Sequence, residues 1–338
     1  MVGSQTENVE RMKPSIIVSR PIYPEVIEKL NKHFNVTAHQ TDPEWTPQAW
    51  AQALSAHDGA LTMGIEPVNA EVLAACPRLR MCANLSVGYN NFDVPAMTQH
   101  KVLATNAPDV LTETTADFGF ALLMAAARRV TESERYIREG HWQKWALESF
   151  AGMAVHGSTL GIIGMGRIGQ AIAKRGAHGF NMHVIYHNRS RLHPSAEAEC
   201  KASYASKNEV LEQADHVVLA LPYSKESHHT IGAAELALMK STATLVNIAR
   251  GGIVDDAALA KALAAGQIAA AGLDVFEGEP KLHPDLLKLS NVVLTPHIGS
   301  STRATRLAMA HLAADNLIAF FSNGSALTPL NPEVLQLP

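Results

Sequence analysis

The chain has 338 residues and a formal net charge of −4, with 47% hydrophobic and 18% charged residues. This length suits about two domains with sizeable cores, and the composition excludes a disordered or fibrous chain. The mildly acidic charge, without any Lys/Arg block, offers no general attraction to nucleic acid or anionic membrane, and the longest clean apolar run, residues 118–127, is too short to span a bilayer.

The N-terminus and the cysteines indicate where the protein resides. Residues 1–12 are polar and carry no apolar secretory core, so we expect a frayed extension with order beginning near Lys13. Cys76, Cys82 and Cys200 are odd in number and widely spaced. They predict buried free thiols in a reducing cytoplasm rather than a disulfide framework.

The first third of the chain alternates β-branched apolar runs with stretches of helical period, which is the βαβ pattern of a parallel sheet. The predicted strands are residues 15–19, 36–39, 59–63, 81–86 and 102–105. The predicted helices between them are residues 24–34, 47–56, 70–75 and 94–100.

A single long helix is then predicted at residues 112–138, followed by a polar segment, residues 140–157, that contains Trp142 and Trp145. The second series of predicted strands is residues 159–163, 184–187, 217–221, 244–248, 270–274 and 292–295. A last amphipathic helix at residues 302–321 closes the chain and is expected to return to the first domain. The pattern predicts two α/β sheets, of which the second is larger.

A glycine-rich turn follows the first strand of this second series. Its G-x-G-x-x-G motif consists of Gly164, Met165, Gly166, Arg167, Ile168 and Gly169, and a helical run follows at residues 170–176. A strand before the motif and a helix after it indicate a dinucleotide site. We expect Gly164 to permit the tight turn, Gly166 to admit the pyrophosphate, and Gly169 to allow close helix–strand packing. The pyrophosphate would then bind N–H groups at the positive end of the helix.

The end of the next strand indicates which dinucleotide binds. NAD sites usually carry an acidic residue about 20 positions after the turn, but no acid occurs from residue 164 through residue 196. Instead the strand ends with Asn188, Arg189, Ser190 and Arg191. Two guanidinium groups and a hydroxyl would bind a 2′-phosphate, so NADP(H) is predicted as the preferred cofactor, with NAD(H) possible as a second one.

Three successive strands of the second domain are followed by charged or titratable residues. They are Arg250, then Glu277 and Glu279, then His297. In open α/β sheets ligands bind at the carboxyl ends of the strands, so we expect these side chains beside the cofactor. Arg250 can bind a carboxylate and polarise a carbonyl, and His297 can transfer a proton near neutral pH. A carboxylate would orient the imidazole, and the pattern alone does not separate Glu277 from Glu279 for that task.

The sixteen histidines contain no metal-ligand pattern, and no metal site is predicted. His228 and His229 are the only adjacent pair, and we expect their side chains to point apart in a solvated loop.

These motifs resemble those of the D-isomer-specific 2-hydroxyacid dehydrogenases, and most of all the glyoxylate/hydroxypyruvate and 2-ketogluconate reductases. The resemblance extends from Lys13 onward and depends on residues 164–169, 247–251, 272–280 and 296–300. It implies that Arg250, Glu279 and His297 are catalytic, with Glu279 as the partner of the histidine. It also implies cofactor contacts for Thr112, Leu221, Pro222, Ile248, Ala249, Asp274 and Gly299, with Asp274 near the nicotinamide. The basic strand end at Arg189 matches the NADP-type reductases.

The resemblance implies a substrate loop in the first domain, at residues 85–90. Backbone N–H groups of Val87 and Gly88 would bind the substrate carboxylate, and Met63 and Gly64 would form an adjacent wall. Asn90 stands where an Asp is common in the family. That departure leaves the backbone donors untouched.

The architecture implied by the resemblance is two Rossmann-like domains. A flavodoxin-like substrate domain would comprise residues 13–107 and 306–338, and a doubly wound NAD(P)-binding domain, residues 108–305, would be inserted between them. A homodimer would form around the long helix and the segment after it, and Trp145 would then reach the partner's active site. The alternative is that both tryptophans pack under their own loop.

The sequence thus predicts an NADPH-preferring reductase that converts small 2-keto acids, namely glyoxylate, hydroxypyruvate or 2-ketogluconate, to D-2-hydroxy acids. Two alternatives share the scaffold. One is a dinucleotide-binding corepressor type, which would have a partner-peptide groove and negligible turnover, although no interaction tail is visible after the last helix. The other is a phosphite or formate dehydrogenase. Glu279 disfavours the formate version, which uses an amide at that position, but does not exclude phosphite.

Overall fold

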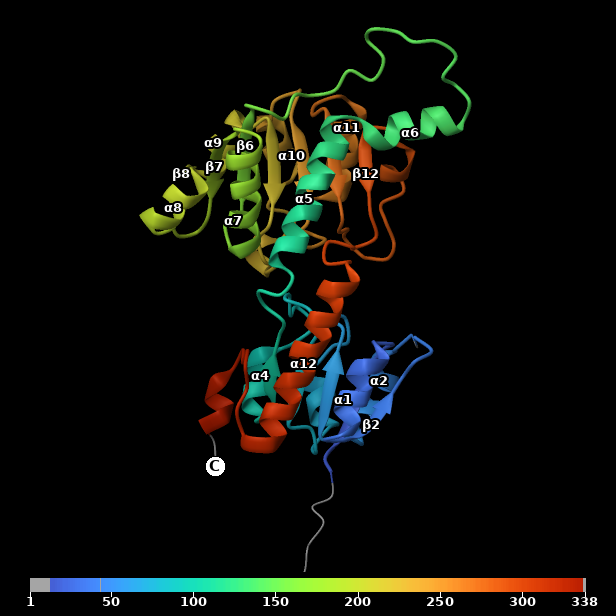
Figure 1. The fold of residues 1–338 in the computed structure, drawn as a ribbon, viewed down its shortest axis with the longest axis vertical. Coiled ribbons are helices and arrows are strands. Elements are labelled where there is room, and N and C mark those ends of the chain that lie inside the picture. The colour runs from blue at the N-terminus through green and yellow to red at the C-terminus, as the bar shows by residue number, and fades with distance from the viewer. Residues whose placement is uncertain (1–12, 43, 337–338) are drawn as a thin grey trace, which may run out of the picture. The chain divides into compact units, whose positions relative to one another are not determined.

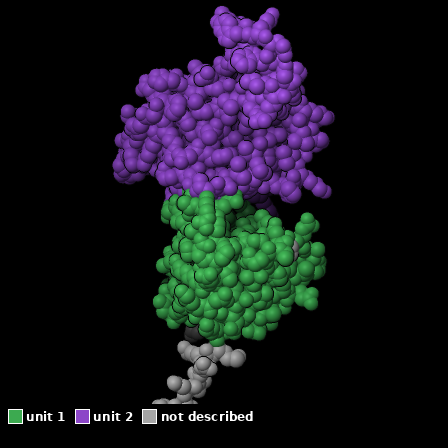
Figure 2. All heavy atoms as spheres, turned by 45° about the vertical axis from the view of Figure 1, so that its right-hand side comes forward, with its two compact units in different colours: residues 1–111, 303–338 green, residues 112–302 purple. Residues whose placement is uncertain are grey.

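The computed structural model describes residues 13–42 and 44–336, so the expected extension at residues 1–12 lies outside the described residues. The chain divides into two compact units, shown in different colours in Figure 2. Unit 1 comprises residues 1–111 and 303–338, and unit 2 comprises residues 112–302. Each unit contains its own parallel sheet.

The sheet of unit 1 has five parallel strands in the order β2-β1-β3-β4-β5. This is the flavodoxin-like order, as predicted. The strands are β1 (Ser15–Val18), β2 (Asn35–Ala38), β3 (Gly59–Thr62), β4 (Met81–Asn84) and β5 (Leu103–Thr105). The helices are α1 (Pro24–Asn31), α2 (Pro47–Ser55), α3 (Ala70–Ala74), α4 (Val94–Gln99) and α12 (Arg303–Asn323). Helix α12 belongs to this unit because its buried residues Ala310, Ala313 and Leu317 join the core formed by β1, β3 and β4.

The sheet of unit 2 has seven parallel strands in the order β12-β11-β10-β9-β6-β7-β8. Read from β6, this is the doubly wound Rossmann order with one strand added. The strands are β6 (Thr159–Ile163), β7 (His183–His187), β8 (Ala202–Tyr204), β9 (His216–Leu219), β10 (Thr244–Asn247), β11 (Ala270–Leu273) and β12 (Val292–Leu294). The helices are α5 (Thr112–Ala127), α6 (Val130–Arg138), α7 (Arg167–Lys174), α8 (Pro194–Cys200), α9 (Lys207–Gln213), α10 (Ala233–Leu238) and α11 (Asp256–Ala264). Both predicted α/β sheets are therefore confirmed, and the second is larger.

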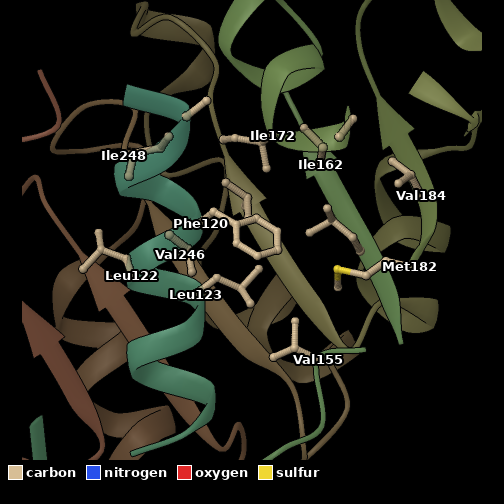
Figure 3. Close-up of a cluster of buried hydrophobic side chains, with 14 of the residues drawn as sticks. Phe120, Leu122, Leu123, Val155, Ile162, Ile172, Met182, Val184, Val246 and Ile248 are labelled. Atoms are coloured by element: carbon tan, nitrogen blue, oxygen red, sulfur yellow. The ribbon is translucent and has the colours of Figure 1, made fainter. Parts of the chain in front are cut away.

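Helix α5 covers one face of the larger sheet. Its side chains Phe120 and Leu123 gather with Ile162, Met182 and Val246 in one buried cluster (Figure 3). Because β9, β10 and β11 are buried at every residue, this sheet is covered on both faces, as is usual for parallel sheets.

Two predictions about these elements were wrong. The single helix predicted at residues 112–138 is two helices, α5 and α6 (Figure 1), because the chain turns at Arg129, whose φ is +55°. Strand β8 was missed, since it has only three residues and two of them are exposed. The prediction for the cysteines is confirmed: Cys76, Cys82 and Cys200 are all buried free thiols.

Within the part of the chain that the structure describes, no helix combines the length and the apolar character needed to cross a membrane.

Candidate active site

The glycine-rich turn lies where the strand order of unit 2 reverses, because β6 stands between β9 and β7. Ligands of doubly wound sheets bind at such a switch point. Gly164 has φ +100°, and a Cβ there would lie only 2.5 Å from the backbone N of Leu221, so the turn packs directly against the loop after β9. A Cβ on Gly166 would meet no atom within 4 Å, and α7 begins at the next residue. The structure thus brings residues 164–169 together with Leu221 and leaves open space before the helix N-terminus.

Asn188 fastens the end of β7 to this turn. Its side-chain oxygen accepts a hydrogen bond from the Met165 N–H at 2.6 Å, and its backbone oxygen accepts one from the Tyr204 hydroxyl at 3.2 Å. The asparagine therefore shapes the predicted cofactor site through its own contacts with the chain.

Arg191 does not stand alone, contrary to the expectation of two cations without an acid. Its Nε and Nη2 donate to the two carboxylate oxygens of Glu197, each at 2.8 Å, and the Tyr186 hydroxyl donates to the same carboxylate at 2.7 Å. The hydrogen bonds from Arg191 and Tyr186 lower the pKa of Glu197 to about 2. Glu197 is the first residue beyond the acid-free stretch, and its side chain is 10% exposed. The charge of Arg191 is thus already matched in the folded chain.

Arg250, Glu279 and His297 come together at one edge of the sheet, because β10, β11 and β12 are adjacent and parallel. The loops after β10 and β11 approach so closely that a Cβ on Gly251 would lie 1.8 Å from the backbone oxygen of Phe276. Only glycine fits at this position. Arg250 is therefore held against the loop that carries Glu279, and the two side chains interact electrostatically.

Glu279, and not Glu277, is the carboxylate beside the histidine. Nδ1 of His297 lies 2.9 Å from Oε2 of Glu279, whose other oxygen accepts the Phe276 N–H at 2.8 Å. Burial alone would raise the pKa of Glu279, but the hydrogen bonds from His297 and Phe276 and the charge of Arg250 lower it. An ionised carboxylate on Nδ1 leaves Nε2 of the imidazole to face a substrate.

Arg250 is partly buried, and burial lowers the pKa of its guanidinium, while the nearby Glu279 opposes that effect. A guanidinium stays protonated in proteins even so. A desolvated, fixed cation next to an acid–base pair is suited to binding an anionic substrate.

Asp274 holds the backbone that presents His297. Its carboxylate accepts hydrogen bonds from Thr295 Oγ1 at 2.7 Å and from the N–H groups of Ile298 and Gly299 at 2.8 Å each. Its backbone oxygen accepts the His297 N–H at 2.9 Å. His297 has φ +53°, a conformation that non-glycine residues adopt only when their surroundings impose it. Asp274 is therefore a positioning residue, a role that sequence reasoning missed although a buried acid at a strand end is a signal for it.

The predicted substrate segments of unit 1 follow its adjacent strands β3 and β4. In the segment that contains Met63 and Gly64, the Met63 N–H donates a hydrogen bond to the carboxylate of Glu66 at 2.8 Å. Glu66 is nearly fully buried and also accepts a hydrogen bond from Arg20 Nε at 2.7 Å. In the other segment, Asn106 donates to the carbonyl of Val87 at 2.8 Å, and Asn84 donates to that of Gly88 at 3.0 Å. Both segments are held by buried polar groups, and Glu66 was not found from the sequence.

Two further expectations were wrong. Trp142 and Trp145 are 60% and 75% exposed, so they do not pack under their own loop. His228 and His229 do not point apart, because their rings stack with centroids 3.8 Å apart. The left-handed backbone of His229, with φ +50°, turns the second ring back over the first.

The chain is similar to known dehydrogenases and reductases over most of its length. The family model described as "D-isomer specific 2-hydroxyacid dehydrogenase, NAD binding domain" matches residues 120–299. The glyoxylate reductase of Thermococcus onnurineus is 46% identical over 330 residues, which cover 96% of this chain and 98% of that protein. The glyoxylate/hydroxypyruvate reductase B of Citrobacter koseri is 45% identical over 324 residues, 96% and 99% of the two chains.

Solved structures show the same likeness. The NADPH-dependent glyoxylate/hydroxypyruvate reductase of Sinorhizobium meliloti, in complex with NADP and malonate, aligns with a TM-score of 0.84 and 33% identity over 94% of this chain and 97% of that one. A glyoxylate reductase from Paecilomyes thermophila aligns with a TM-score of 0.85 and 31% identity, over 95% and 99% of the two chains.

The chain belongs to the D-isomer-specific 2-hydroxyacid dehydrogenases, and it is an oxidoreductase with a Rossmann-type domain for a nicotinamide dinucleotide.

Proposed function

We propose that the protein reduces small 2-keto acids, glyoxylate and hydroxypyruvate foremost and 2-ketogluconate as a further substrate, to D-2-hydroxy acids, with NADPH preferred over NADH. The observation that carries the proposal is the His297–Glu279 pair, 2.9 Å between Nδ1 and Oε2, on the strand edge that also bears Arg250. The relatives from Thermococcus onnurineus, Citrobacter koseri and Sinorhizobium meliloti are named as reductases of glyoxylate or hydroxypyruvate, which supports the same substrate class.

Each residue of the site has a task in this reaction. The guanidinium of Arg250 binds the substrate carboxylate and polarises the neighbouring carbonyl. The imidazolium of His297, oriented through Nδ1 by Glu279, donates the Nε2 proton to the carbonyl oxygen as that oxygen gains negative charge. Asp274 keeps the histidine turn in place. Val87 and Gly88 of unit 1 offer backbone N–H groups to the carboxylate, with Met63 and Gly64 as a wall.

The residues present fit the dinucleotide. The space before α7, which a side chain at position 166 would fill, leaves the helix N-terminus accessible to a pyrophosphate. We assign contacts to the residues 164–169 and 188–191 and to Thr112, Leu221, Pro222, Ile248, Ala249, Asp274 and Gly299. When bound there, the reduced nicotinamide supplies the hydride that goes to C2 of the keto acid.

The preference for NADPH depends mainly on Arg189 and Ser190, and Arg191 contributes less to binding of the 2′-phosphate. Because Glu197 already pairs with Arg191, a 2′-phosphate would have to share that guanidinium. Arg189 directly follows Asn188, whose side chain is hydrogen-bonded to the glycine turn, and this supports our expectation that Arg189 lies close to the ribose of the bound dinucleotide.

We also propose that the protein is a cytoplasmic homodimer and that the segment after α6 reaches the partner. In Figure 1 this segment projects from unit 2 as a long loop beyond α6. It exposes Trp142, Trp145 and Leu147, with 60%, 75% and 78% of their surfaces accessible. Large apolar side chains in such an arm gain most when a second surface covers them.

The experiment is a scan of NADPH and NADH oxidation with glyoxylate, hydroxypyruvate, pyruvate and 2-ketogluconate. We expect turnover with glyoxylate and hydroxypyruvate, a higher kcat/KM with NADPH, and a D configuration of the product. His297→Ala is the control, with kcat lower by about 10² or more, the scale of general acid–base catalysis. Tight dinucleotide binding without turnover of any keto acid would overturn the proposal in favour of a corepressor type, and turnover of phosphite alone would favour a phosphite dehydrogenase.

A further inference from the structure

A cluster of metal-ligand side chains lies in unit 2 apart from Arg250, Glu279 and His297. His228 and His229 come from the loop after β9, and Glu277 comes from the loop after β11. Nε2 of His229 is 2.9 Å from Oε2 of Glu277, and Nε2 of His228 is 3.9 Å from Oε1 of the same carboxylate. The candidate ligand atoms of the three residues all lie within 4.8 Å of one another.

Backbone hydrogen bonds hold the residues of this cluster close together. The N–H of His229 donates to the carbonyl of Gly252 at 2.7 Å, and its left-handed φ of +50° stacks the two rings. On the other side, the N–H of Glu277 donates to the buried carboxylate of Asp256 at 3.1 Å. The cluster therefore joins three loops through contacts that the sequence pattern does not reveal.

The first histidine also has an outer partner. Nδ1 of His228 lies 3.2 Å from the hydroxyl of Tyr223, which leaves Nε2 directed to Glu277. Metal-binding histidines usually have their second ring nitrogen hydrogen-bonded in this way, because the bond fixes the tautomer and the ring orientation.

We propose that His228, His229 and Glu277 bind a divalent transition-metal ion of the zinc class, with water completing its coordination. Two imidazoles and one carboxylate are a ligand set preferred by Zn²⁺ and its neighbours in the first transition row. Ligand atoms at about 2.0–2.1 Å from a tetrahedral zinc ion lie about 3.4 Å from one another, so small side-chain rotations bring the present atoms to that spacing.

The electrostatics of the cluster favour a cation. The carboxylate of Glu277 faces both stacked rings, at 2.9 Å from Nε2 of His229 and 3.9 Å from Nε2 of His228, so a negatively charged ligand atom stands beside two imidazole nitrogens. The buried Asp256, which accepts the Glu277 N–H, adds a second carboxyl group close by. A divalent ion neutralises this charge and ties the loop after β9 to the loop after β11.

The direct test is Zn²⁺ binding by isothermal titration calorimetry to the full-length protein after dialysis against EDTA, with Co²⁺ absorption as a spectroscopic reading of the ligand set. We expect one high-affinity ion per chain, a Co²⁺ spectrum of low coordination number, and a Zn²⁺-dependent rise in Tm. Glu277→Gln and His229→Ala should each weaken Zn²⁺ by at least about 10-fold. His183→Ala removes an exposed histidine at the start of β7 and should bind Zn²⁺ like the wild type.

The proposal is overturned if the wild type binds no Zn²⁺ above the background of its other histidines, or if Glu277→Gln binds it as tightly as the wild type. Glu277→Gln is isosteric and exposed, so it keeps the test valid should His229→Ala fail to fold. Because the readouts are binding, absorption and Tm, a negative result here leaves the reductase proposal standing, and a failure of that proposal leaves the metal site standing.

Discussion

The charge of Glu279 should set the pH at which reduction fails. Its Oε2 lies 2.9 Å from Nδ1 of His297, and the two side chains are 33% and 49% exposed. At this separation and in a water-like dielectric, the attraction between a carboxylate and an imidazolium is about 1.4 kcal/mol, which is about tenfold in an equilibrium constant. Glu279→Gln removes the charge and keeps an oxygen that accepts from Nδ1, so the ring orientation is preserved.

The sign follows from the direction of proton transfer. Reduction needs the imidazolium, so kcat/KM falls as pH rises, and the anion of Glu279 delays that fall by favouring the protonated ring. In Glu279→Gln the midpoint of this basic limb should therefore move to lower pH, and kcat/KM within that limb should fall by up to about tenfold. The assay is kcat/KM for glyoxylate between pH 5 and 10 at saturating NADPH, in buffers containing EDTA.

A matched control is available two residues away. Glu277→Gln removes the same charge from the same loop, but Glu277 contacts His229 and not His297, so the midpoint should stay at its wild-type value. A midpoint of Glu279→Gln that does not move, or that moves to higher pH, would refute the assignment of Glu279 as the charged partner of His297.

Three further predictions address the cofactor, the stability and the subunit boundary. Arg189→Ala should raise KM for NADPH about 10-fold or more, the scale of a charge-assisted hydrogen bond, and leave KM for NADH nearly unchanged, whereas Arg191→Ala should cost less; equal losses for both cofactors would contradict this order. Burial raises the pKa of Asp256 to about 6, although the Glu277 N–H opposes the rise. Ionisation of Asp256 thus destabilises the fold above about pH 6 and not below about pH 4. Relative to the wild type, Asp256→Asn should therefore have a free energy of unfolding that is higher by up to about 3 kcal/mol at pH 8 but not at pH 4, as measured by urea denaturation. A stabilisation of the same size at both pH values would refute this prediction. Trp145→Ala should reduce kcat/KM more for hydroxypyruvate and 2-ketogluconate, which carry a C3 hydroxyl, than for glyoxylate, and a fully active monomer in sedimentation would contradict the proposed arm.

Much of the fold could be predicted because the strands of a parallel sheet, buried on both faces, are continuous apolar runs in the sequence. Buried apolar runs between turn residues placed every strand of both sheets except β8, whose three residues bury only one side chain. The boundary between α5 and α6 could not be predicted, since Arg129 adopts a left-handed conformation without the glycine or proline that usually marks a break. Long, regular elements follow from pattern, whereas a single residue in an unusual conformation follows from its surroundings.

The site divides in the same way. The positions after three adjacent strands predicted that Arg250 and His297 would meet with either Glu277 or Glu279, and the family resemblance singled out Glu279. Neither predicted the contacts between loops. Glu197, which pairs with Arg191, is the first residue after the acid-free stretch of residues 164–196. The stacking of His228 on His229 depends on a backbone angle that the residue types do not reveal.

The two acids near the histidine divide the work of positioning it. Glu279 is held ionised by its hydrogen bonds and acts on the ring, where a negative charge favours the imidazolium. Burial raises the pKa of Asp274, and the three hydrogen bonds that its carboxylate accepts oppose the rise. Because these donors belong to residues 295, 298 and 299, Asp274 fixes the segment around the histidine and not its ring. Because Nδ1 faces Glu279, the ring can exchange a proton at Nε2 without leaving its position. Asp274 holds the left-handed backbone of His297, and Glu279 faces its ring. The histidine can therefore stay fixed in position while its protonation changes.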